Sequence, residues 1–173
     1  MDTFFEQIIP KRKTPKDLAL LFLIWFAAVI IFAASILFLL PIIQIMAIAI
    51  GAAGFYGAWF LGTSLNVEFE YSVTNGYFDI DKIVARRKRK REVSLECKDV
   101  EAFGKYNQAE HTHRNYQKRI IAGDETSEDA WYASFRHKEF GMTLIVFEPD
   151  ERILGAIKKF LPKLVAKDAF GRY

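Results

Sequence analysis

The chain has 173 residues, a formal net charge of +3, 51% hydrophobic residues and 26% charged residues. That length accommodates one ordinary domain, or a small domain together with membrane-spanning segments. The single cysteine, Cys97, excludes an intrachain disulfide and fits a reducing compartment.

The charged residues are segregated along the chain. No Asp, Glu, Lys or Arg occurs between Leu18 and Val67. One bilayer-spanning helix needs about 20 apolar residues, so this block predicts two spans. Because proline breaks a helix interior, Pro41 divides the block into a helix at residues 18–39, a tight turn at Leu40–Pro41 and a helix at residues 42–61. The alternatives are a buried core hairpin and a re-entrant hairpin that does not reach the far side.

The amino-terminal segment, residues 1–17, is basic and precedes the first helix. Its last residues, Thr14–Asp17, offer a capping hydroxyl, a proline at the first helical position and an acid at the third. Before them, Phe4, Phe5, Ile8 and Ile9 recur at helical spacing and indicate a short amphipathic segment in the membrane interface.

Basic residues near the first span predict its orientation, since such residues stay on the cytoplasmic side. They are Lys11, Arg12, Lys13 and Lys16. Two spans return the chain to the same side. The predicted topology therefore has both ends of the chain in the cytoplasm.

Small residues recur on one face of the second helix, at Ala47, Gly51, Gly54 and Ala58. Helices in lipid associate by close backbone approach at such faces. The face either packs against the first helix of the same hairpin or forms a seam between copies of the chain.

Residues 64–173 read as a separate cytoplasmic domain, because the pattern changes there to alternating apolar and polar residues. Asn75-Gly76 is a strong hairpin signal. Residues 107–129 are polar and predict a long loop, and Pro149–Glu151 opens an amphipathic helix. The predicted strands are Val67–Val73, Phe78–Val84, Val93–Cys97, Val100–Tyr106, Trp131–Phe135 and Met142–Phe147.

A meander of antiparallel strands followed by one amphipathic helix resembles the pleckstrin-homology-like (PH-like) fold. The segment Ser64–Arg91, together with the basic amino-terminal flank, resembles a family of small bacterial membrane proteins of uncharacterised function. The resemblance implies an α+β membrane protein of the bacterial inner membrane. Its transmembrane helical hairpin would precede a PH-like antiparallel β-barrel or sandwich with a carboxy-terminal amphipathic helix. It implies no catalytic residue. The PH fold hosts many functions, so the fold alone assigns no chemical role to any side chain.

Six consecutive basic residues follow the second predicted strand: Arg86, Arg87, Lys88, Arg89, Lys90 and Arg91. Three interpretations of this run are open. It is a solvated hairpin tip, it attracts anionic lipid headgroups, or it binds an acidic protein or nucleic acid. Nucleic acid is disfavoured, since the run contains no aromatic residue on which bases stack.

Candidate residues for chemistry are few, and we expect no catalytic site, no metal site and no cofactor. His111 and His113 lack further metal ligands and predict a solvated loop. Cys97 alternates with apolar residues and is expected to be buried. Asp79 and Asp81 lie beside the basic run and are expected to pair with it.

These patterns leave three functional hypotheses. The first is a non-catalytic, membrane-tethered binding or scaffolding module, whose basic run contacts anionic lipid or an acidic protein partner. The second is a lipid-headgroup enzyme with a pocket near residues 107–129. The third is a small transporter or channel subunit that forms homo-oligomers through the small-residue face.

Overall fold

The computed structural model of the chain describes residues 4–39 and 41–171. The chain divides into two compact units, which we describe separately. The helical unit runs from Lys13 to Val67, and the PH-like unit combines the segment up to Arg12 with Glu68–Tyr173.

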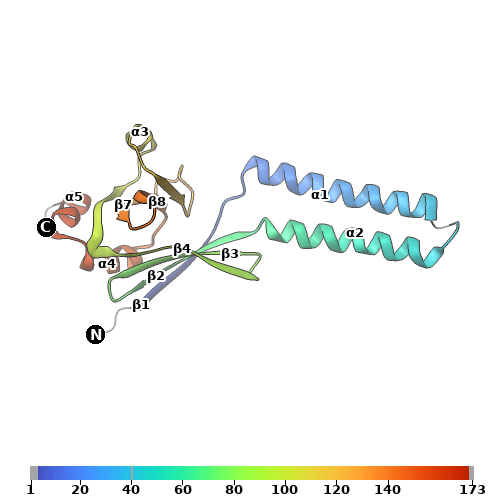
Figure 1. The fold of residues 1–173 in the computed structure, drawn as a ribbon, viewed down its shortest axis with the longest axis horizontal. Coiled ribbons are helices and arrows are strands. Elements are labelled where there is room, and N and C mark those ends of the chain that lie inside the picture. Colours follow the sequence, from blue (N-terminus) through green and yellow to red (C-terminus); the bar gives the residue numbers. More distant parts are fainter. Residues whose placement is uncertain (1–3, 40, 172–173) are drawn as a thin grey trace. The chain divides into compact units, whose positions relative to one another are not determined.

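The helical unit contains α1 (Pro15–Ala34), a π-helical turn (Ser35–Leu39) and α2 (Gln44–Ser64) (Figure 1). The predicted cap at the start of α1 is confirmed. Asp17 N donates to Thr14 Oγ1 (3.3 Å), and Thr14 N donates to Asp17 Oδ2 (2.9 Å). Both expected helices are present. α1 begins earlier than predicted, and α2 ends later.

Most apolar side chains of α1 and α2 remain exposed within the chain. In the most apolar stretch of each helix, only 11% and 17% of the residues are buried. Both helices are long and apolar enough to cross a membrane. The predicted turn at Leu40–Pro41 lies partly outside the described residues, because Leu40 is not described.

The first sheet of the PH-like unit has the strand order β1-β2-β3-β4. Its strands are antiparallel in the pairs β1–β2 and β3–β4. Asn75 and Gly76 form the predicted hairpin turn between β2 and β3, both with positive φ. The strands are β1 (Phe4–Pro10), β2 (Val67–Thr74), β3 (Tyr77–Val84) and β4 (Lys88–Glu96).

The strand β1 corrects our interpretation of the amino-terminal segment. Phe4, Phe5, Ile8 and Ile9 do not form an amphipathic helix, and the helical spacing was misleading. The segment pairs with β2 in register from Phe4 opposite Thr74 to Pro10 opposite Glu68. Burial follows a period of two, because Phe5, Gln7 and Ile9 are half-buried while Phe4 and Ile8 are exposed.

The second sheet has the order β5-β7-β8-β6, in which β6 runs parallel to β8. The predicted loop at residues 107–129 contains β6 and the short helix α3. Both elements are too short for a periodic pattern to predict. The elements are β5 (Val100–Lys105), α3 (Gln108–Thr112), β6 (Lys118–Ile121), β7 (Trp131–His137) and β8 (Gly141–Phe147).

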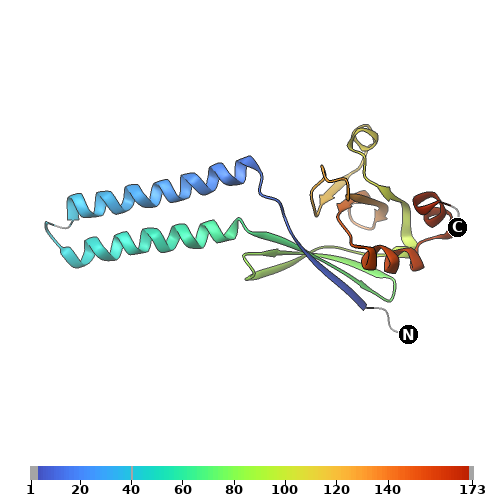
Figure 2. The same ribbon diagram turned by 180° about the vertical axis from the view of Figure 1, so that it is seen from behind.

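Two helices end the chain where one was predicted (Figure 2). The helix α4 (Glu151–Phe160) begins at a cap in which Ile153 N donates to Asp150 Oδ1 (2.8 Å). Pro162 then separates it from α5 (Lys163–Phe170), as expected of a residue that cannot continue a helix. Phe170 of α5 packs on the second sheet.

Aromatic side chains connect the two sheets. Phe147 of β8 lies 5.0 Å from Phe78 and 5.8 Å from Tyr71, measured between ring centroids. All three side chains are fully buried. The described strands form two sheets and no closed barrel, which corrects the barrel alternative. The chain passes from β4 to β5 through a single 3₁₀ turn, Cys97–Asp99, and β5 pairs with β7.

Candidate functional site

The basic run begins in the turn between β3 and β4 and continues along β4. Arg87 N donates to Val84 O (3.0 Å), which closes the turn. Ala85 and Arg86 have φ of 54° and 55°. This left-handed conformation costs roughly 1–2 kcal/mol for each residue with a Cβ. This conformation was not predictable from the residue types, because neither residue is a glycine or asparagine.

Strand alternation divides the run between the two faces of the sheet. A bulge beside Ile80 and Asp81 shifts the β3–β4 register, so that Asp81 lies opposite Arg91 and Ile83 opposite Arg89. These residues share one face. Lys82 lies opposite Lys90 and Val84 opposite Lys88, so the lysines occupy the other face.

Three arginines of the run pair with acids, as predicted for Asp79 and Asp81. Arg89 Nε donates to Asp81 Oδ2 (2.8 Å), and its guanidinium also binds Glu70. Arg91 donates to Asp81 Oδ1 (2.7 Å) and to Asp79 Oδ2 (2.8 Å). Arg86 pairs with Glu68 at 3.0 Å. The four carboxylates therefore outnumber the three guanidinium groups on this face.

The pKa values of the two most buried acids of this network are shifted in opposite directions. Hydrogen bonds from Arg91 hold the pKa of Asp81 below its usual value, even though burial opposes ionisation. Burial raises the pKa of Glu70, and its ion pair with Arg89 offsets this only in part. Asp81 therefore anchors the arginines, whereas Glu70 is a weaker partner.

The lysines of the opposite face are left to solvent. Lys82, Lys88 and Lys90 form no ion pair among the residues that the structure describes. Lys82 lies directly opposite Lys90, and like charges in that position destabilise a ladder. We call these three residues the lysine face. It offers positive charge that an anion from outside the chain can neutralise.

The basic residues predicted to set the topology lie in the segment between β1 and the first turn of α1. They are Lys11, Arg12, Lys13 and Lys16, and all four are exposed. Arg12 Nη1 pairs with Asp124 Oδ2 at 3.0 Å. This basic residue therefore also ties the end of β1 to the loop before β7.

The small-residue face of α2 packs within the helical unit. Ala47, Gly51 and Ala58 are buried, whereas Gly54 is partly buried. A Cβ added to Gly51 would lie 2.7 Å from Phe32 Cδ2, and one added to Gly54 would lie 3.2 Å from Ile31 Cγ2. These neighbours belong to α1 and account for the small residues without a second copy of the chain.

His111 is buried, so the predicted solvated loop is wrong at this residue. It is 1% exposed among Tyr106, Tyr116 and Tyr132, and its Nδ1 lies 2.9 Å from the Tyr116 hydroxyl. Burial lowers the pKa of His111, which favours the neutral ring. Within residues 4–39 and 41–171, no group of three or more His, Cys, Asp or Glu side chains could hold a metal ion.

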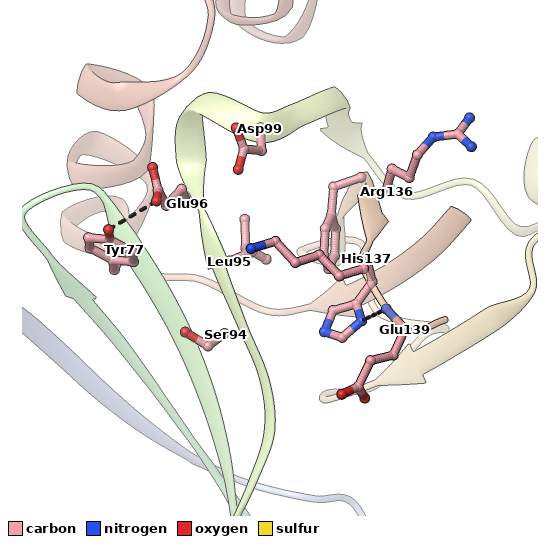
Figure 3. Close-up of a pocket in the computed structure, with 10 residues that line it drawn as sticks. Tyr77, Ser94, Leu95, Glu96, Asp99, Arg136, His137 and Glu139 are labelled. Atoms are coloured by element: carbon pink, nitrogen blue, oxygen red, sulfur yellow. Dashed lines mark hydrogen bonds between the residues drawn. The ribbon is translucent and has the colours of Figure 1, made fainter. Parts of the chain in front are cut away.

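Cys97 and the cleft beside β4 offer little for catalysis. Cys97 is fully buried, as predicted, and burial raises its pKa to about 12, so it is a poor nucleophile. A cleft of about 330 Å³ lies between β4 and the end of β7 (Figure 3). Its lining includes no residue of the segment 107–129, where the enzyme hypothesis expects a pocket.

The comparisons with known proteins agree with this architecture. A family model described as "Bacterial PH-like domain (DUF6106)" matches residues 1–167. No curated protein and no solved structure gives a match. The matched range includes both the helical unit and the PH-like unit, as the sequence resemblance implied. The chain therefore belongs to the DUF6106 family of bacterial PH-like domains.

Proposed function

We propose that the protein is a membrane-tethered, non-catalytic binding module. In this proposal α1 and α2 span the bacterial inner membrane, and the PH-like unit lies at its cytoplasmic surface. The lysine face contacts anionic lipid headgroups there.

The pairing of β1 with β2 is the observation that carries the proposal. β1 precedes both long apolar helices and β2 follows them, yet the two strands pair over seven residues from Phe4 to Pro10. Both ends of the helical hairpin must therefore emerge on the same side of any membrane that it enters. The basic flank around α1 favours the cytoplasm as that side.

The connections between helices and strands are short. β1 ends at Pro10 and α1 begins at Pro15, while only Leu65 and Asn66 separate α2 from β2. Such short links limit how far the chain can run between the helices and this end of the first sheet. The β3–β4 turn belongs to the same end, since Arg86 pairs with Glu68.

Charge supports lipid over an acidic protein as the partner of the lysine face. A basic residue near an anionic leaflet contributes about 1 kcal/mol. Three lysines alone would give only weak affinity for a lipid surface. The helices already hold a tethered domain near the membrane, so the lysines need only orient it. Arg86, Arg89 and Arg91 add little, because acids of the sheet already neutralise them.

Liposome flotation tests the proposal on a variant in which an Asn-Gly turn replaces residues 13–65, which we call the short-turn variant. β1 and β2 then form an ordinary hairpin. Without the tether we expect weak binding, measurable at high phosphatidylserine content and low salt, that decreases as salt is added. Changing Lys82, Lys88 and Lys90 to Gln should remove most of it.

The matched control changes Lys159, Lys163 and Lys167, three exposed lysines of α4 and α5, to Gln. Both triple variants lose the same charge, so equal loss of binding would refute a specific role of the lysine face. In the full chain, carbonate extraction and accessibility of cysteines placed before α1 and after α2 test the tether. Accessibility from opposite sides of the membrane would refute the topology.

A further inference from the structure

The outer edge of β4 presents free backbone groups. β4 is an edge strand, and Cys97 N donates to Gly76 O (2.8 Å) across the β3–β4 ladder. Hydrogen-bonded pairs alternate with non-hydrogen-bonded pairs along such a ladder. Leu95 therefore directs its backbone groups toward β3, and Ser94 and Glu96 direct theirs away from it. These outward groups form no backbone hydrogen bond with another described element.

A second free edge lies across the 330 Å³ cleft. β5 pairs with β7 only up to Val100 opposite Phe135, so Arg136 and His137 have no partner on that side of β7. Ser94, Glu96, Arg136 and His137 all line the cleft (Figure 3). The cleft is thus bordered by two strand edges, and a further strand can form backbone hydrogen bonds with them.

Carboxylates line the β4 side of the cleft. Lys98 forms an ion pair with Glu96 and the Tyr77 hydroxyl donates to Glu96 Oε1 (2.9 Å), and both contacts hold the pKa of Glu96 below its usual value. Asp99, also at this wall, forms no ion pair among the described residues. The Arg136 side chain points away from β4, and its guanidinium lies 3.9 Å from Glu101 (Figure 3). Lys98 already neutralises Glu96, and Lys138 also lines the cleft, so the negative charge available to an external cation beside the free edge is that of Asp99.

We propose that this cleft binds an extended peptide segment of a partner protein, which adds to β4 as a further strand. Backbone hydrogen bonds to Ser94 and Glu96 supply affinity, and a basic side chain of the peptide lies beside Asp99. Strand addition of this kind combines backbone affinity with side-chain specificity.

The Asp99 carboxylate, unpaired within the described part of the chain, favours a basic peptide over an acidic one. The cleft is also distinct from the lysine face. From Lys90, the nearest lysine of that face along β4, to Ser94 the strand extends about 14 Å at roughly 3.4 Å per residue. Peptide and lipid can therefore bind together, and this inference does not depend on the lipid contact.

The test uses the full chain in phosphatidylcholine nanodiscs, whose lack of net charge prevents cationic peptides from binding the lipid. The probe is a capped, fluorescent heptapeptide of alternating threonine and valine with a central lysine. Its controls carry a central glutamate, or N-methyl groups on alternate residues. Fluorescence anisotropy measures affinity, and amide hydrogen exchange reports protection at Ser94 and Glu96.

We expect the lysine peptide to bind at least ten-fold more tightly than the glutamate peptide, and to slow exchange at both amides. Asp99→Asn should remove most of this preference. Ser94→Pro deletes only an outward N–H and should weaken both peptides at least ten-fold while the ladder with β3 persists. If that variant does not fold, the N-methylated peptide makes the same test on the unaltered protein.

Three results would overturn the inference. One is the absence of saturable binding of the lysine peptide up to millimolar concentration. Another is equal affinity of the lysine and N-methylated peptides. The third is binding without slower exchange at Ser94 and Glu96. Each is independent of lipid binding by Lys82, Lys88 and Lys90, so the two proposals fail separately.

Discussion

Pro10 pairs with Glu68, although the entire helical hairpin lies between them in the chain. The first strand of the PH-like unit is therefore separated from the rest by an insertion. Gln7 of this strand also binds the start of α4, because its side chain accepts from Asp150 N (2.8 Å) and donates to Glu148 O (3.1 Å).

This pairing predicts that a fragment beginning at Ser64 is defective. Without β1, the edge of β2 is exposed and the contacts of Gln7 are lost. We expect such a fragment to be less stable than the short-turn variant by about 3 kcal/mol or more, from lost apolar burial and backbone pairing. Urea unfolding followed by tryptophan fluorescence measures the difference.

Two neighbouring isoleucines provide a matched test of the strand. Ile9→Ser should destabilise the short-turn variant by about 1–2 kcal/mol, whereas Ile8→Ser should have an effect below about 0.5 kcal/mol. Ile9 is half-buried and Ile8 is 52% exposed. Equal effects of the two substitutions would contradict the alternation.

The pKa of Asp81 is lowered and that of Glu70 is raised. Replacing each acid by its neutral amide should therefore affect the free energy of unfolding differently. Asp81→Asn should lower the free energy of unfolding at pH 7 by about 2 kcal/mol, because two arginines lose a charged acceptor. Glu70→Gln should be neutral or slightly stabilising, because burial disfavours its charge.

The pH dependence of stability distinguishes the two acids. The folded pKa of Asp81 is lowered, so its contribution is present above pH 3.8 and is lost as the pH falls through the folded pKa. The folded pKa of Glu70 is raised, so wild type loses stability relative to Glu70→Gln as the pH rises above 4.5. Urea midpoints between pH 3 and pH 8 measure both trends. A Glu70→Gln advantage that shrinks as the pH rises would contradict the assignment.

The left-handed turn at Ala85 predicts a stabilising substitution. Ala85→Gly should raise the free energy of unfolding by about 1 kcal/mol, because glycine adopts positive φ without a Cβ clash. Ala166→Gly, in α5, is the control and should destabilise by about 0.5–1 kcal/mol. Thermal midpoints of the short-turn variant compare the two. Destabilisation at both positions would argue against the turn conformation.

The close approach of α1 and α2 predicts different tolerance at two glycines of the same helix. Gly51→Leu should destabilise the helix pair by about 1–3 kcal/mol, because Phe32 occupies the space of a side chain. Gly57→Leu should be tolerated, because a Cβ there meets nothing within 4 Å. Thermal unfolding in detergent, followed through Trp25, reports the result. If Gly57→Leu is the more harmful change, position 57 rather than position 51 faces a neighbour.

Local signals predicted much of the fold. The apolar blocks, the cap at Thr14, the Asn75-Gly76 turn and the alternating strands depend on residues close together in the chain, and each is confirmed. The segment Phe4–Pro10 fits both a helical and an alternating pattern. Its partner strand lies beyond the hairpin, and only that long-range pairing decides between them.

The candidate site was harder to predict for the same reason. Six adjacent basic residues look alike in the sequence, but their partners lie on other strands. Glu68, Glu70, Asp79 and Asp81 neutralise one face only, and the bulge at Ile80 sets which residues share that face. The outward edge at Ser94 depends on the register with β3, which no local pattern encodes.

The interrupted sheet also constrains biosynthesis. β1 leaves the ribosome before α1 and α2 but cannot complete its ladder until β2 has been made, which takes several seconds at about 5–20 residues per second. A hairpin inserted with its ends on opposite sides of the membrane would leave β1 and β2 permanently apart. If α1 and α2 insert as proposed, completion of the first sheet therefore depends on correct insertion, and a misinserted chain keeps an incomplete sheet.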